Sequence, residues 1–192
     1  GKLDDQLIRE VGRIAASFHA EAEQATPDMP YGSAEAAFDP MQQNFDQLRG
    51  LIEEEDKLRQ LDTLEQWTRD SHAKLKSLLD KRKSEGYIRE CHGDMHLGNM
   101  ALIRGDVVIF DGIEFNERMR WTDVLGDVGF LAMDLEDRRL NTHAHRFLNL
   151  YFEYSGDYAA LPLLKGTEVL GVLGAASSIK QDFGERSAFL EV

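Results

Sequence analysis

Apolar residues near the start of the chain recur at steps of three and four positions, with charged residues between them. Leu7, Val11, Ile14 and Phe18 follow this spacing, which is that of a helix with one buried face. The pattern therefore predicts an amphipathic helix over residues 3–23.

The next two segments differ sharply in proline content. Residues 25–40 hold three of the four prolines in the chain, and proline disfavours helix interiors, so we predict an irregular connector there. Residues 41–85 have few β-branched residues and place leucines at helical steps, which predicts a helical insertion of two helices. Gly86 is expected to end it.

Three short apolar runs follow, at residues 87–91, 100–103 and 107–110. Their length is typical of strands, and the last two are separated by Arg-Gly-Asp at 104–106, a spacing that suits a hairpin. We read this tripeptide as a turn, because an integrin-binding role would need an extracellular context that nothing else in the chain supports.

Helical spacing returns over residues 122–135 and 143–154 and is predicted to continue beyond Pro162. The tail over residues 165–192 opens on a stretch rich in Gly, Ala and Ser, where the pattern predicts no firm element. The order of helices, a small β-hairpin unit and helices again describes a mostly helical α+β fold. A length of 192 residues is expected to form a single domain.

Composition excludes some classes of function. The chain carries 35 acidic and 22 basic residues, a formal charge of −13, which argues against nucleic-acid binding because that activity rests on clustered Lys and Arg. No signal peptide or membrane-length apolar run is evident, so we expect a cytoplasmic protein without a membrane partner. The single cysteine, Cys91, is expected to be buried and without a chemical role. His19, beside the apolar face of the first helix, is expected to be a packed histidine rather than a ligand.

The segment from residue 91 to 111 carries the candidate chemistry. Asp94 and Asn99 stand in the D-x-x-x-x-N relation of a kinase catalytic loop, in which the Asp accepts the proton of a substrate hydroxyl and the Asn holds Mg²⁺. Asp111 follows the hairpin, where a second metal-binding carboxylate belongs. A strand, a loop and an immediate hairpin would bring these three residues together, so we predict a phosphoryl-transfer site that binds Mg²⁺ and ATP or GTP.

The polar residues around this set each have more than one possible role. His96 is expected to orient the loop or touch the transferred phosphate, whereas His92 is expected to pack beneath the loop and hold its backbone. Glu114 could equally contact the metal or cap a local turn. Asp123 and Asp127 open a predicted helix, so capping is their first explanation, and anchoring of the catalytic loop is a second one for Asp127.

Two rival interpretations stay open at this stage. His92, Asp94 and His96 alternate along the chain, and as ligands on one strand they would bind zinc for hydrolysis. This reading leaves Asn99 and Asp111 unexplained. The other rival is a kinase-like binding or regulatory module without turnover, and the intact set of Asp94, Asn99 and Asp111 argues against it.

The sequence from His92 to Asn99 resembles the His-Gly-Asp-x-His-x-x-Asn signature of aminoglycoside phosphotransferase-like and choline-kinase-like enzymes. The resemblance extends over most of the chain, and we expect it to end near Leu164. It implies the C-terminal lobe of a protein-kinase-like fold, with Asp94 as catalytic base. It also implies that Asn99 and Asp111 bind Mg²⁺, that Asp127 supports the loop, and that the acceptor is the hydroxyl of a small molecule.

The sequence around Asp94, Asp111 and residues 133–136 is similar to that of a bacterial branch of this family, whose members are often fused to a P-loop ATPase domain. No Gly-rich strand pair with a phosphate-binding Lys precedes the first helix, so we expect this chain to lack the N-terminal lobe. By the resemblance, an N-terminal lobe and a P-loop ATPase domain could be fused to this chain or supplied by a partner. Acceptor specificity is expected to lie in residues 41–85 and after His143.

Overall fold

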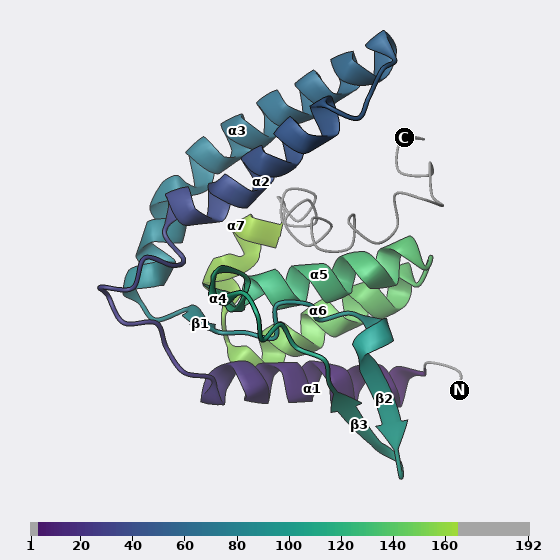
Figure 1. Cartoon of the computed structure of the whole chain (residues 1–192). Helices are drawn as coiled ribbons and strands as arrows, with labels where there is room; N and C mark the ends of the chain where they lie inside the picture. Colours follow the sequence, from purple (N-terminus) through teal and green to yellow (C-terminus); the bar gives the residue numbers. More distant parts are fainter. Residues whose placement is uncertain (1–3, 165–192) are drawn as a thin grey trace.

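The computed structural model describes residues 4–164, which form a mostly helical α+β fold with two small sheets (Figure 1). This agrees with the fold class expected from the sequence. The helices are α1 (Asp5–Glu21), α2 (Ala34–Arg49), α3 (Glu55–Ser84), α4 (Glu117–Arg120), α5 (Leu125–Asp137), α6 (Asn141–Ser155) and α7 (Leu161–Leu164). The strands are β1 (Ile88–Glu90), β2 (Met100–Ile103), β3 (Asp106–Ile109) and β4 (Trp121–Asp123), and short 3-10 turns occupy Leu97–Asn99 and Tyr158–Ala160.

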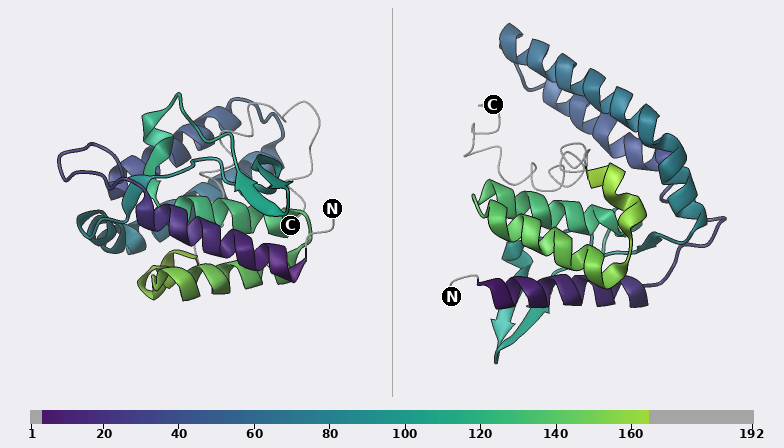
Figure 2. Two further views of the ribbon diagram at one scale, coloured as in Figure 1. Left: turned by 90° about the horizontal axis from the view of Figure 1, so that it is seen from below. Right: turned by 180° about the vertical axis from the view of Figure 1, so that it is seen from behind.

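Helices α1, α5 and α6 enclose the main core. α1 begins where the Asp4 side chain accepts hydrogen bonds from the backbone N–H groups of Gln6 and Leu7, and the predicted helix is confirmed. Figures 1 and 2 show α1 and α6 running side by side, with α5 packed on α6. Fully buried side chains on the three helices include Ile8, Leu125, Val128, Leu131, Leu135 and Phe147. Burying each such side chain contributes about 1.5–3 kcal/mol, and this core fixes the position of α5 against α6 and α1.

Helices α2 and α3 pair into an arm that stands out from the core helices (Figures 1 and 2). Two helices were predicted here, but the predicted connector was too long: residues 34–40 are helical, and Pro40 lies inside α2. Ser33 caps the helix by accepting the backbone N–H of Ala36, and the side chains of Met41 and Phe45 in the following turns are buried. One proline removes a single backbone hydrogen bond, and this packing outweighs that loss.

The two sheets each contain two antiparallel strands. The predicted hairpin is confirmed as β2 paired with β3, with Met100 opposite Ile109. Its turn is shorter than predicted, because Asp106 belongs to β3 and only Arg104 and Gly105 connect the strands. Both connecting residues have positive φ, 56° and 97°, as a tight two-residue hairpin turn requires.

The helix predicted from residue 122 instead begins at Leu125. Residues 121–123 form β4, which pairs with β1 so that Ile88 lies opposite Asp123. Helical spacing could not reveal this pairing, because it depends on an edge supplied more than thirty residues earlier. The short helix α4, just before β4, was not predicted.

Helix α6 is confirmed, and the helix predicted around Pro162 is α7 as far as Leu164. The tail prediction for residues 165–192 lies outside the described residues. No helix within residues 4–164 is both long and apolar enough to cross a membrane.

A buried arginine fastens the arm to the rest of the fold. Arg82, near the end of α3, is 1% exposed and donates hydrogen bonds of 2.6–2.9 Å to the carboxylates of Asp123 and Asp157. Its guanidinium also lies over the Tyr87 ring, 4.0 Å from the centroid. Burial alone would lower the pKa of Arg82, but the hydrogen bonds to the two carboxylates outweigh it and the pKa ends above its ordinary value.

Candidate active site

The candidate catalytic loop runs from Cys91 to His96, between β1 and the 3-10 turn that precedes β2. Asp127 of α5 accepts the backbone N–H of His92 at Oδ2 and that of Gly93 at Oδ1, each at 2.8 Å. Gly93 has φ +79°, and a Cβ there would lie 3.0 Å from the carbonyl oxygen of Met119. Only glycine fits this turn without strain.

The far end of the loop is also tied to α5. Asp134 accepts the backbone N–H of Leu97 at 2.9 Å and pairs with Arg138. Sequence reasoning did not identify Asp134 as a site residue. The available signal was its spacing from Asp127, since residues seven apart share one face of a helix.

Asp94 lies at the centre of the loop with its two carboxylate oxygens in different surroundings. Asn99 donates from Nδ2 to the Asp94 carbonyl oxygen at 3.0 Å and to Oδ2 at 3.2 Å. Oδ1 is buried and has no hydrogen-bond partner among the described residues. The Asp94 side chain as a whole is 26% exposed, so a bound hydroxyl can reach the carboxylate and donate its proton to it.

His92 joins the loop to the hairpin. Its Nε2 lies 2.9 Å from the carbonyl oxygen of Phe110, and the N–H of Asp94 points to its Nδ1 at 3.3 Å. A carbonyl only accepts, so Nε2 carries the proton and Nδ1 accepts. His92 therefore holds backbone on both sides of the site.

His96 approaches Asp94 from the other side. Its Nδ1 accepts the backbone N–H of Gly98 at 2.9 Å, and its Nε2 lies 3.5 Å from Oδ2 of Asp94. The ring meets Phe130 edge-on at 5.9 Å between centroids. These contacts direct Nε2 of His96 towards the carboxylate.

Asp111 follows β3 and is exposed, with φ +61°. A positive φ is uncommon for a residue other than glycine and is often found at functional sites. The backbone on both sides is bound to the loop: Phe110 N–H donates to the Asn99 carbonyl at 3.0 Å, and Ile113 N–H donates to the His92 carbonyl at 2.9 Å. The fold thus brings the Asp94, Asn99 and Asp111 segments together.

The donor set suits Mg²⁺, which prefers oxygen ligands and keeps several waters or phosphate oxygens. Because Nδ2 of Asn99 is engaged with Asp94, its amide oxygen is the atom left for a cation. Within residues 4–164, Asp94, Asp111 and Glu114 do not form a group whose ligand atoms all lie within 4.8 Å. The residues therefore fit a site shared with nucleotide phosphates better than a closed protein cage.

The structure decides between some of the alternatives for the acidic residues. Glu114 is exposed, and the turn that starts α4 is capped by Asn116, which accepts the N–H of Arg118 at 3.1 Å. Asp123 accepts the N–H of Leu125 at 2.9 Å, at the start of α5. The capping explanation is wrong for Asp127, because its carboxylate is directed to the loop.

The zinc interpretation is not supported by this geometry. Residues 92–96 form a loop and not a strand. Both ring nitrogens of His92 and Nδ1 of His96 are hydrogen-bonded to backbone groups. Among the described residues, His92, Asp94 and His96 are not a group with ligand atoms within reach of one ion.

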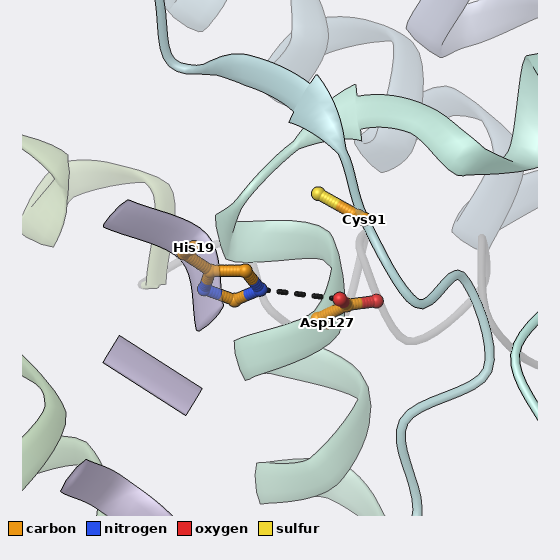
Figure 3. A group of neighbouring side chains, drawn as sticks. All are labelled: His19, Cys91 and Asp127. Carbon is orange, nitrogen blue, oxygen red and sulfur yellow. Dashed lines mark hydrogen bonds and ion pairs between the residues drawn. The ribbon is translucent and has the colours of Figure 1, made fainter. Parts of the chain in front are cut away.

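A buried polar cluster lies beneath the loop: His19 of α1, Cys91 and Asp127 (Figure 3). His19 is packed, as expected, at 3% exposure, and its Nε2 lies 3.1 Å from Oδ2 of Asp127. Cys91 is buried, as expected, with its thiol 3.5 Å from the Thr122 carbonyl oxygen. Burial raises the pKa of Cys91, which keeps the thiol neutral.

Comparison with known proteins supports a phosphotransferase assignment. A family model described as "Phosphotransferase enzyme family" matches residues 2–164, so the match ends where the sequence resemblance was expected to end. The uncharacterized proteins Rv2004c and MT2060 of Mycobacterium tuberculosis and Mb2027c of Mycobacterium bovis are each 35% identical over 82 residues. These alignments cover 43% of this chain and 16% of each relative. No solved structure gives a significant match.

Proposed function

Because this chain belongs to the phosphotransferase enzyme family, we propose that it forms the catalytic lobe of a Mg²⁺-dependent kinase. This kinase transfers the γ-phosphoryl group of ATP or GTP to a hydroxyl of a small molecule. The observation that carries the proposal is the state of Asp94: Asn99 holds the carboxylate in place through Oδ2, and the side chain stays 26% exposed, so a substrate can reach it. A general base needs an acceptor atom that is held in place and free to bind a proton.

The chemistry assigned to the residues of this chain is simple. The carboxylate of Asp94 accepts the proton of the acceptor hydroxyl as the hydroxyl oxygen attacks the γ-phosphorus, and the bond from the γ-phosphorus to the β,γ-bridging oxygen breaks to release the nucleoside diphosphate. Asn99 and Asp111 would hold Mg²⁺, with Glu114 as a candidate third ligand. The metal would neutralise charge on the β- and γ-phosphates.

The surrounding residues orient these groups. His92 and Asp127 fix the backbone of the loop, and His96 lies beside Asp94, where it could also meet the transferred phosphoryl group. Positioning of this kind accounts for much of the catalysis in phosphoryl transfer. Two further features stay predictions. One is that this lobe has the protein-kinase-like fold. The other is that an N-terminal lobe and a P-loop ATPase domain are fused to it or supplied by a partner.

The proposal is tested by following label from γ-³²P-ATP, with Mg²⁺, into a panel of hydroxyl compounds that includes aminoglycosides, choline, sugars and nucleosides. We expect transfer into one chemical class, and we expect Asp94→Asn to slow it by about 100-fold or more. Asp106→Asn is the matched control, because Asp106 is an exposed carboxylate of the same hairpin and its loss should leave the rate unchanged. Transfer by Asp94→Asn at the unmodified rate would remove Asp94 as the base.

A further inference from the structure

The arm formed by α2 and α3 has an interior of its own. Met41 and Phe45 of α2 and Leu61 of α3 are buried, and Arg49 of α2 pairs with Glu65 of α3 at 2.6 Å. Within residues 4–164, the two helices pack over most of their length only on each other, and Figures 1 and 2 show the arm standing away from α1, α5 and α6. The arm therefore keeps its shape mainly through internal contacts.

The arm joins the rest of the fold at one end, which we call its base. The chain enters the arm just after Gly32 and leaves it at Gly86, and both glycines have positive φ, 70° and 81°. Near the end of α3, Leu75, Leu78 and Leu79 are partly buried against the main core. A long element held at one end can tilt unless contacts at its base fix the angle.

A small change of angle at the base would move the rest of the arm a long way. α3 has 30 residues, so it is about 45 Å long at a rise of 1.5 Å per residue. Gln60 lies 22 residues before Arg82, and a tilt of about 10° at the base would displace it by about 6 Å. The position of the arm thus depends on the side chains around Arg82.

The polar contacts at the base converge on Arg82. Its guanidinium donates two hydrogen bonds to Asp123, which precedes α5, and two to Asp157, which follows α6, all at 2.6–2.9 Å. We call these three residues the Arg82 cluster. A guanidinium is planar and its donors have fixed directions. Two bidentate pairs on different segments therefore fix the direction of the end of α3 as well as its place.

The chemistry of the Arg82 cluster suits selection of one orientation better than it suits stability. Buried ion pairs lose to desolvation most of what they gain from attraction, and apolar residues of similar volume often give equal or greater stability. Hydrogen bonds between charged groups instead require a particular distance and angle. The neighbouring leucine contacts are non-directional, because apolar burial depends on area and not on angle.

We propose that the arm is hinged at its base and that the Arg82 cluster selects its orientation. Arg82 is then a positioning residue for the arm. Asp123 also accepts the backbone N–H of Leu125 at the start of α5, so the cluster sets the angle of the arm relative to the helix that supports the catalytic loop. The orientation is a property of the folded chain and is measured without substrate.

The test is the distribution of distances between two spin labels, measured by double electron–electron resonance on the whole chain. Labels at Gln60→Cys of α3 and Glu153→Cys of α6, both exposed positions, report the orientation of the arm. Cys91 is buried and is expected to stay unlabelled. A second pair, Gln60→Cys with Lys74→Cys, lies within α3 at about 21 Å and reports whether the helix itself is intact.

We expect a single narrow α3–α6 distribution in the unmodified chain. Arg82→Met should broaden or displace it by about 6 Å or more, the movement expected for a tilt of about 10°, and leave the pair within α3 unchanged. Adding Asp157→Asn should recover part of the stability but not the narrow distribution, because no donor is left to fix the angle. Arg49→Met, which removes ion pairs inside the arm, is the matched control and should change neither distribution.

A narrow, undisplaced α3–α6 distribution in Arg82→Met would overturn the proposal and assign the orientation to the leucine contacts. A distribution that narrows again in the double variant would do the same, because Arg82 would then act only through stability. If the Arg82→Met variants do not fold, Asp157→Asn alone should give a smaller broadening, and no broadening would contradict the proposal. Phosphate transfer enters none of these outcomes, so this proposal and the proposed function fail separately.

Discussion

Replacing Arg82 by methionine is expected to lower the free energy of unfolding by about 3–5 kcal/mol. Arg82 is 1% exposed and binds Asp123 and Asp157, whose side chains are 12% and 3% exposed. Without the guanidinium, two enclosed carboxylates would face each other with no counter-charge. The cost of leaving these two carboxylates unpaired sets the size of the loss in unfolding free energy. The net value of the ion pairs does not, because a buried ion pair gains little over apolar packing.

The expected loss is large compared with the stability of a typical domain, about 5–15 kcal/mol. Loss of the stacking contact with Tyr87 adds to it, so we expect the upper half of the range. Adding Asp157→Asn to the Arg82→Met variant should recover part of the stability, because it removes one of the two uncompensated charges.

Urea unfolding followed by circular dichroism measures these changes, provided that the slope of the transition is unchanged. Arg49 offers a matched control: it also donates to two carboxylates, Asp62 and Glu65, but its side chain is 41% exposed. Arg49→Met should shift the midpoint only slightly, since water replaces the lost partners. Equal midpoint shifts for the two variants would refute the reasoning from burial.

Three further predictions concern single residues. Gly93→Ala and Gly156→Ala should each lower the free energy of unfolding by about 1–2 kcal/mol, because both positions have positive φ. In urea unfolding Gly93→Ala should be the less stable of the two, because its added Cβ would lie 3.0 Å from a backbone carbonyl oxygen, whereas nothing lies within 4 Å at Gly156. Hydrogen bonds, led by that from Gln42, lower the pKa of Glu65 from 4.5 to about 2. The ionised carboxylate therefore contributes fully to stability above pH 4.5, and this contribution is lost as pH falls towards 2. The difference in the free energy of unfolding between the unmodified chain and Glu65→Gln should narrow over that interval, and a constant difference would contradict this cause. Cys91, buried and with a raised pKa, should react with a thiol reagent at pH 8 only after unfolding in urea, and rapid labelling of the folded chain would contradict its burial.

The sequence allowed good prediction of features that depend on near neighbours. The apolar spacing of α1 and α6, the hairpin of β2 and β3, and the order of polar residues around Asp94 are all local patterns. They were predicted because helix, strand and turn preferences act within a few residues. The helical spacing also placed two helices before β1.

Features that depend on distant partners could not be predicted in this way. β4 forms only because β1 offers an edge, and α2 extends across Pro40 because α3 covers its apolar face. For Asp127 the residues alone favoured helix capping over anchoring of the loop, because nothing in the sequence shows that the N–H groups of His92 and Gly93 point at its carboxylate. The partners of Arg82 are similarly invisible, because they lie 41 and 75 residues further along the chain.

Calorimetric titration of ATP into the whole chain, with and without Mg²⁺, tests the central claim most directly. The assignment of Asn99 and Asp111 to a metal-nucleotide site predicts binding of one ATP that requires Mg²⁺, that is weakened by Asp111→Asn, and that is unchanged by the control Asp106→Asn. No binding, or equal binding without Mg²⁺ that Asp111→Asn leaves unaltered, would contradict it.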